Sequence, residues 1–287
     1  MFGTGLRHFL KHPMHTLAAV TADPVEAWTV LRDIYAARRE AQIPSDLYEA
    51  EEGWEQRLHN LLGAPWPCQA TSEFWALWPE VIGELQAKGI RVGPESFKTW
   101  NDGDAGLVRA IWCLCRHLRP RNVVETGVAH GLTSRFILEA LERNGDGHLW
   151  SIDLPPLEEA LHDQIGMAVG DRHSHRWTLI KGSSRRRLPP VLSQLGQIDL
   201  FIHDSLHSER NVRFEMESAW TILRPGGAIV VDDIDANRAF LNFTQTFSHH
   251  QSMICEAEPI QPDLRRFNEK GLFGIILKEP TKSNAQS

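Results

Sequence analysis

The sequence predicts an α/β fold in which a doubly wound, mainly parallel, seven-stranded sheet follows a helical N-terminal extension. Apolar residues before residue 101 recur at helical spacing without a strand pattern. From Leu107 onward, short β-branched runs alternate with amphipathic stretches, which is typical of parallel strands joined by right-handed crossovers. Two apolar runs near the C-terminus predict a hairpin-like edge that closes the sheet.

The N-terminal extension is expected to contain three helices. Apolar stripes follow Pro24 and Pro44, over residues 25–35 and 47–61, and a third covers residues 74–85. Five tryptophans lie in this segment: Trp28, Trp54, Trp66, Trp75 and Trp78. They could form an aromatic lid over a substrate, but a packed helical cap is the preferred interpretation, because large aromatic side chains fill core first.

The main domain is expected to begin near Asn101. Residues 89–103, with Pro94 and the NDGD turn, read as its boundary. The expected helices are 107–118, 132–141, 157–168, 188–195 and 210–223; the expected strands are 122–125, 148–153, 177–181, 198–203 and 228–231, with edge strands at 253–256 and 273–278. The sequence therefore divides into an extension (1–100), a domain (101–279) and a flexible tail (280–287).

Composition narrows the functional classes. The 287 residues carry a net charge of −7, which disfavours nucleic acid as a partner. No apolar run approaches the ~20 residues that span a bilayer, and the N-terminus lacks a signal-peptide core, so a cytoplasmic location without membrane contact is expected. The four cysteines lack the two-residue spacer of zinc sites and are expected to be buried free thiols.

Ligands of open α/β sheets bind beyond the carboxyl ends of the strands. The first strand of the domain ends in a loop in which Gly127 would allow a tight turn and Gly131 would let the next helix approach. This spacing differs from the GxGxxG loop of dehydrogenases. Glu125, just before the loop, would repel a pyrophosphate but attract the ammonium and sulfonium of S-adenosylmethionine. Asp153 ends the second strand, where a carboxylate could accept ribose hydroxyls.

Four segments carry a family resemblance: VVETGVAHGLTS, SIDLPP, IDLFIHDSLHS and LRPGGAIVVDDID, in this order. Together they resemble a class I methyltransferase, which has a Rossmann-like fold. They are most similar to the metal-dependent small-molecule O-methyltransferases, the branch with catechol, caffeoyl-CoA and natural-product sugar enzymes. The resemblance covers residues 101–278, and the extension matches no family that we can name.

The resemblance implies S-adenosylmethionine as the methyl donor. Glu125, Gly127 and Thr133 would then hold its methionine part, with Gly131 in the same loop. Asp153 would hold the ribose, and Ser183 would lie near the adenine. An ordinary surface turn is an equally good interpretation of the segment around Ser183.

Three further carboxylates, Asp204, Asp232 and Asp233, follow neighbouring strands and would form a Mg²⁺ site that activates a substrate hydroxyl. Alternatively, Asp232 and Asp233 form a strand-end turn with only one side chain facing the cleft. His207 stands where catechol-type enzymes carry a lysine base, so His207 and Asp204 are the candidate catalytic residues. His207 could instead be a metal ligand or make a structural hydrogen bond.

The expected activity is Mg²⁺-assisted O-methylation of a small hydroxylated metabolite or sugar. Two alternatives are an NAD-dependent oxidoreductase on a similar sheet and a non-catalytic adenosyl-binding interaction protein. An RNA methyltransferase is disfavoured by the acidic charge balance. The sequence does not identify the acceptor, because extensions and insertions build acceptor pockets. The Trp-rich extension could also pack across the axis of a homodimer.

Overall fold

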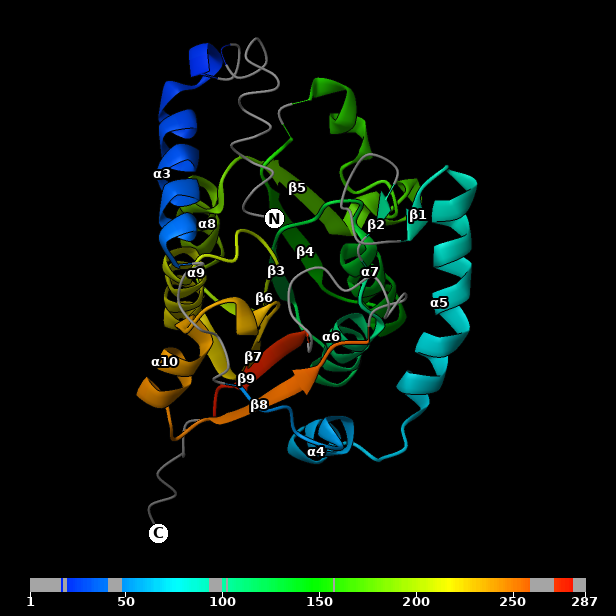
Figure 1. Ribbon diagram of the computed structural model, residues 1–287. Helices are drawn as coiled ribbons and strands as arrows, with labels where there is room; N and C mark the ends of the chain where they lie inside the picture. Colours follow the sequence, from blue (N-terminus) through cyan, green and yellow to red (C-terminus); the bar gives the residue numbers. More distant parts are fainter. Residues whose placement is uncertain are drawn as a thin grey trace.

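A seven-stranded sheet with helices on both faces forms the centre of the protein (Figure 1). The structure, a computed structural model, describes residues 17, 20–40, 48–92, 100–101, 103–156, 158–258 and 271–280. The tail predicted over 280–287 lies outside these residues except for Pro280. The strands are β3 (Asn122–Thr126), β4 (His148–Asp153), β5 (Trp177–Lys181), β6 (Ile198–His203), β7 (Leu223–Val231), β8 (Gln251–Glu256) and β9 (Leu272–Leu277).

The strand order is β5-β4-β3-β6-β7-β9-β8. Strands β3 to β7 pair in parallel, whereas β9 is antiparallel to both β7 and β8. The predicted α/β fold class, with its hairpin-like edge, is confirmed. The chain winds outward from β3 to β5 and then returns to place β6 on the other side of β3. This reversal between β3 and β6 is the point at which open sheets bind ligands.

Alternating side chains of the strands bury two separate cores. Val123 of β3 belongs to a core under α6 (Ala105–Leu118) and α7 (Leu132–Asn144). Its neighbour Val124 belongs to the opposite core, under α8 (Ser184–Leu195), α9 (Glu209–Ile222) and α10 (Ala239–Thr246). This two-sided burial explains why the strands read as continuous apolar runs.

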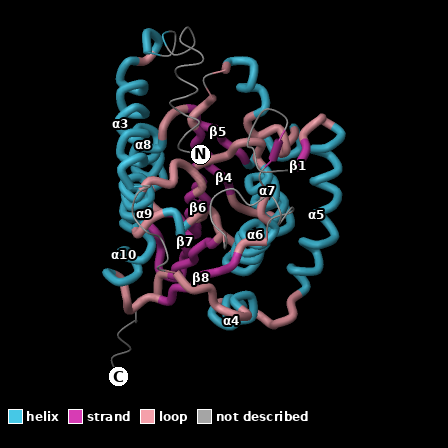
Figure 2. The backbone as a smooth tube through the Cα atoms, in the orientation of Figure 1, coloured by secondary structure: helices cyan, strands magenta, loops and turns pink. Residues whose placement is uncertain are grey.

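The N-terminal helices lie on both sides of this sandwich (Figure 2). Helix α3 (Pro24–Glu40) packs beside α9, α4 (Trp54–Leu61) beside β8 and α5 (Gln69–Ala87) beside α6. The Trp112 indole of α6 donates a 2.7 Å hydrogen bond to the carbonyl of Ala70 in α5. The expected helices after Pro24 and over 74–85 are therefore confirmed.

Two predicted helices are wrong in extent or type. The helix predicted over 47–61 begins only at Trp54, after Gly53 at φ 67°, because the amide of Glu51 bonds to the carbonyl of Ile254 at 2.9 Å instead. The helix predicted over 157–168 is a 3₁₀ turn, η1 (Glu159–Gln164), followed by Gly166 at φ 71°. Both departures come from backbone bonds and left-handed glycines that side-chain periodicity does not report.

Several short elements were also not predicted. A parallel pair, β1 (Arg91–Val92) and β2 (Trp100–Asn101), lies in the extension and its boundary, where no strand was expected. Helix α10 and the 3₁₀ turns η2 (Asp171–Arg176) and η3 (Ile234–Ala236) complete the described elements. Two-residue strands are too short to produce a periodic signal.

The tryptophans of the extension divide between core and surface. Trp54 is buried against Phe273, with ring centroids 5.4 Å apart, and Trp78 packs on the core. Trp28, in contrast, is 68% exposed and Trp75 is 45% exposed. Packing thus accounts for only part of this aromatic content.

The four cysteines are buried and free, as predicted. In the part of the chain that the structure describes, no helix combines the length and apolar character needed to cross a membrane.

Candidate active site

The turn after β3 meets the end of β6 at the reversal point of the sheet. Gly127 has φ 87°, and a Cβ on this residue would lie 1.9 Å from the carbonyl oxygen of Asp204. The Asp204 amide also donates a 2.8 Å hydrogen bond to the Thr126 carbonyl. Only glycine permits this contact, so Gly127 joins the predicted donor loop to the predicted cation site.

Glu125 is almost fully buried at the end of β3. Its Oε2 accepts hydrogen bonds from the hydroxyls of Ser134 at 2.6 Å and Ser151 at 2.8 Å. Its Oε1 is also shielded from solvent but has no hydrogen-bond partner among the described residues. Burial, reinforced by the nearby Asp153, raises the Glu125 pKa to about 7. A cationic group beside Oε1 would reverse this cost, so this carboxylate is suited to an ammonium.

Asp153 ends β4 beside the same loop. Its carboxylate accepts the amide of Ala129 at 3.1 Å, and burial raises its pKa to about 7. Ala129 itself has φ 46°, a left-handed conformation that costs alanine roughly 1–2 kcal/mol. Strain of this kind concentrates at functional loops. Asp153 is thus held at the strand end, where a ribose would be recognised.

The remaining predicted donor residues have different surroundings. Gly131 precedes α7 at φ 80° and packs against Gly166, and Thr133 is half-buried in the first turn of that helix. Ser183 precedes α8, and its amide donates to Glu26 Oε1 of α3 at 2.9 Å. The extension therefore reaches the residue predicted to lie near the adenine.

The predicted cation site gathers beyond β6 and β7. Ligand atoms of Asp204, His207 and Asp232 all lie within 4.8 Å of one another. Asp233 lies beside them, with its Oδ2 3.7 Å from His207 Nε2. The structure thus brings Asp204 and Asp232 together with the imidazole of His207, whereas Asp233 lies outside this group and approaches it through His207. About a third of the Asp204 and Asp233 side chains is exposed to solvent, whereas the His207 side chain is 10% exposed.

Repulsion between the carboxylates would favour a cation at this cluster. Burial, followed by the charges of Asp233 and Asp204, raises the Asp232 pKa well above its usual range. A divalent ion would relieve this repulsion by replacing the proton. The donor set of carboxylates with one imidazole suits Mg²⁺ on its oxygen atoms, and Mn²⁺ if His207 also binds.

His207 is poised as a neutral imidazole. Burial lowers its pKa, and Asp233 only partly opposes that effect. Its Nε2 lies 3.8 Å from Asp204 Oδ1. Behind it, the His203 ring lies edge-on at 5.3 Å and binds Glu215 Oε2 of α9 at 2.6 Å. A neutral ring can accept a proton from a substrate hydroxyl.

Sequence reasoning missed the residues that hold the site in place. Glu215 accepts hydrogen bonds from the Thr126 hydroxyl at 2.5 Å, the Ser205 hydroxyl at 2.7 Å and the Asn211 amide at 2.8 Å. It thereby ties β3 and the loop that carries His207 to α9. Its only sequence signal was a glutamate on the apolar face of the 210–223 helix, which could have marked a buried network.

Comparison with known proteins identifies the domain around this site. Residues 124–234 match a family model described as a methyltransferase domain. No curated protein is significantly similar in sequence. The matched segment runs from β3 to the end of β7 and contains both the donor loop and the carboxylate cluster.

Several solved structures are similar to the chain. An O-methyltransferase from Bacillus cereus bound to S-adenosylhomocysteine is 14% identical, with 78% of this chain and 97% of that chain covered and a TM-score of 0.47. TomG from Streptomyces achromogenes, involved in tomaymycin synthesis and bound to S-adenosylmethionine, is 14% identical, with coverages of 84% and 96% and a TM-score of 0.46. A candidate O-methyltransferase from Klebsiella pneumoniae is 14% identical, with coverages of 78% and 96% and a TM-score of 0.49.

These TM-scores lie below 0.5, so the assignment rests on the family match and on the strand order of the chain itself. Five parallel strands, a reversal after β5 and an antiparallel β9 inserted between β7 and β8 match the fold expected from the sequence. Residues 124–234 therefore match a methyltransferase domain, and the sheet around them has the doubly wound strand order that the sequence resemblance implies.

Proposed function

We propose that the protein transfers the methyl group of S-adenosylmethionine to a hydroxyl oxygen of a small molecule, with a divalent cation, Mg²⁺, at the carboxylate cluster. The observation that best supports the proposal is the close packing of Gly127, in the predicted donor loop, against the backbone of Asp204, in the carboxylate cluster. Methyl transfer requires in-line placement of donor and acceptor, and this contact brings their two sites together.

On the donor side, the unpaired Oε1 of Glu125 binds the ammonium of the methionine part. Gly127 and Gly131 let the backbone approach the ligand, and Thr133 lines the same helix start. Asp153 accepts the ribose hydroxyls. Ser183 lies beside the adenine, at the start of α8, and its amide remains bonded to Glu26.

On the acceptor side, Asp204 and Asp232 hold the cation, with Asp233 as the third carboxylate. When bound, the cation lowers the pKa of the acceptor hydroxyl and orients it. His207 accepts the hydroxyl proton at Nε2, which faces Asp204 and Asp233. The Glu215 network keeps the His207 loop in place while this proton moves.

A sugar or another small hydroxylated metabolite is the acceptor class that suits this chemistry. Free, buried cysteines fit a reducing compartment, so we place the reaction in the cytoplasm. The acidic cluster would repel the phosphates of RNA, which favours a small acceptor over an RNA.

The donor assignment is tested by calorimetry with S-adenosylhomocysteine. Asp153→Asn should weaken binding by at least about tenfold, because an amide cannot accept both ribose hydroxyls as a carboxylate does. Asp146→Asn, on an exposed turn, is the matched control and should bind normally. Stabilisation by NADH instead of S-adenosylhomocysteine would indicate the oxidoreductase alternative.

The acceptor side is tested by turnover of S-adenosylmethionine with a panel of sugars and phenols. Activity should disappear with EDTA and return with Mg²⁺ or Mn²⁺. Full activity in EDTA would remove the cation from the proposal. Binding of the donor product without turnover of any acceptor would support the non-catalytic alternative.

A further inference from the structure

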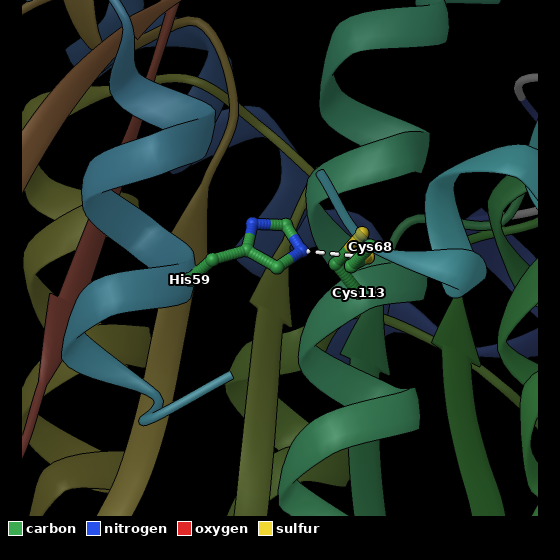
Figure 3. Close-up of side chains that lie close together, drawn as sticks. All are labelled: His59, Cys68 and Cys113. Carbon is green, nitrogen blue, oxygen red and sulfur yellow. Dashed lines mark hydrogen bonds between the residues drawn. The ribbon is translucent and has the colours of Figure 1, made fainter. Parts of the chain in front are cut away.

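A second, separate cluster of metal-ligating side chains lies between helices of the extension and the main domain. His59 comes from α4, Cys68 directly precedes α5, and Cys113 comes from α6 (Figure 3). All three are almost fully buried, and their ligand atoms lie within 4.8 Å of one another.

The His59 ring presents a lone pair to this cluster. Its Nδ1 lies 2.7 Å from the carbonyl oxygen of Glu55. A carbonyl only accepts, so Nδ1 carries a hydrogen, and Nε2 is the ring nitrogen that could present a lone pair to a metal. Nε2 in turn lies 2.9 Å from Cys68 Sγ, as the dashed line in Figure 3 shows. A ring fixed by a backbone carbonyl in this way is the usual arrangement of a metal-binding histidine.

The sulfur of Cys68 is placed to be a thiolate. Cys68 is the N-cap of α5, and its Sγ accepts the Thr71 amide at 3.4 Å. The Thr71 hydroxyl lies 3.3 Å from Cys68 Sγ and 3.7 Å from Cys113 Sγ, between the two sulfurs. Helix N-termini and hydrogen-bond donors both stabilise thiolate, which is the form that binds metals.

A second histidine lies one helical turn beyond Cys113, outside the group of three whose ligand atoms lie within 4.8 Å of one another. His117 follows Cys113 by four residues in α6 and therefore lies on the same helix face. Its Nε2 is shielded from solvent and makes no hydrogen bond within the described ranges. The centroids of the His117 and His59 rings are 5.2 Å apart.

We propose that His59, Cys68 and Cys113, completed by His117, form a structural zinc site. Two sulfurs and two imidazole nitrogens make the donor set that Zn²⁺ takes in closed tetrahedral sites. Bonds of about 2.3 Å to sulfur and about 2.0 Å to nitrogen place neighbouring ligand atoms roughly 3.3–3.8 Å apart. This lies within the 4.8 Å that spans His59, Cys68 and Cys113. Mg²⁺ is unsuited to this set because it prefers oxygen.

This site joins α4 and α5 to α6, the first helix of the main domain. The zinc holds the extension in place without taking part in methyl transfer, and the site is independent of the proposed reaction. The spacing is His-x8-Cys for the first pair and Cys-x3-His for the second. Cys115, two residues after Cys113 on the same helix, does not belong to this cluster.

The test begins with the full-length wild-type protein, purified without chelators. Elemental analysis should find about one zinc per chain. A strong chelator should remove it, lower the melting temperature by several degrees and expose two thiols to a thiol reagent. Re-addition of Zn²⁺ should reverse all three effects, and Co²⁺ should give the visible absorption of a tetrahedral thiolate site.

Variants identify the ligands. Cys68→Ser and Cys113→Ser should each lose the zinc, and His117→Ala should bind it more weakly. Cys115→Ser, which replaces a buried thiol two residues away on the same helix, is the matched control and should keep it. Asp232→Asn should also keep it, which separates this zinc from a cation at the carboxylate cluster.

Two results would overturn the proposal. A wild-type protein that neither contains zinc nor gains stability from it would show that the cluster is a set of hydrogen-bonded thiols. A disulfide between Cys68 and Cys113, detected as two thiols that appear only after reduction, would show that the pair is redox-linked instead.

Discussion

At the scale of single residues, Gly127 carries the closest backbone contact of the site. Replacing it with alanine would place a methyl group against the Asp204 carbonyl. Gly145 is the matched control, because its φ of 80° is similar but nothing lies within 4 Å of a Cβ there. Both variants carry the left-handed strain of roughly 1–2 kcal/mol. Only Gly127→Ala should also abolish calorimetric binding of S-adenosylhomocysteine, and equal behaviour of the two would contradict this.

Glu125 should make the ligand-free protein sensitive to pH. Burial raises its pKa from 4.5 to about 7. The folded state holds this proton more tightly than the unfolded state does. The contribution of Glu125 to the free energy of unfolding is therefore complete below pH 4.5, and it is lost as the pH rises through about 7, by up to roughly 3 kcal/mol. Glu125→Gln should remove this part of the decline in denaturant titrations at about pH 5 and about pH 8.

The same substitution should weaken binding of S-adenosylhomocysteine, because a neutral amide attracts an ammonium less than a carboxylate does. Asp153 titrates in the same window and contributes its own decline in both proteins. The exposed Glu80→Gln is a control that should change neither property. An unchanged pH profile in Glu125→Gln would show that the buried carboxyl is not the source.

The sequence located most of the site residues but not their supports. Glu125, Asp153 and Asp204 lie at the carboxyl ends of strands. The alternation of strand and helix patterns in the sequence is enough to locate those ends. Ser134, Ser151 and Glu215 support them from other elements, and their contacts depend on strand register and helix rotation, which one sequence does not specify.

At the scale of elements, α8 begins with a cap supplied by another helix. Its N-cap residue Ser183 makes no side-chain cap, and Glu26 of α3 instead accepts the Ser183 amide. Glu26→Ala should therefore cost about 1 kcal/mol and speed amide exchange in the first turn of α8. Glu80→Ala, on the exposed face of α5, should cost much less. Unchanged exchange in α8 would argue against this cap.

Strands and long helices of the main domain were predictable because buried faces impose a period on the sequence. The structure of residues 157–168 could not be predicted in this way, because Gly166 takes φ 71° and its amide bonds to the Ala129 carbonyl at 2.9 Å. Its apolar residues suggested a helix, whereas a contact with the donor loop fixed its backbone. Tertiary contacts of this kind override local propensity.

At the scale of the whole molecule, the extension and the main domain share one core. Leu58 of α4, Phe74 of α5 and Phe273 of β9 belong to the same buried cluster. We therefore expect one cooperative unfolding transition, although the sequence divides at residue 101. Coincident melting by circular dichroism and tryptophan fluorescence would check this; two separated transitions would show independent units.

Two variants of α4 test whether the extension and the main domain share this core. Leu58→Ala should destabilise the entire chain by about 2–5 kcal/mol, because it opens a cavity in the shared core. Leu61→Ala, three residues further along α4 and 38% exposed, should cost far less. A loss confined to the extension in Leu58→Ala would contradict a shared core.

Glu51, just before α4, and Arg57, within α4, cover the outer edge of the sheet. Strand β8 is the last strand on its side, and its Ile254 and Ser252 carbonyls accept from the Glu51 amide and the Arg57 guanidinium. Acceptors occupied in this way offer no template to a strand from a neighbouring molecule. The residues around the start of α4, where the expected helix is interrupted, thus disfavour polymerisation of the protein through the β8 edge.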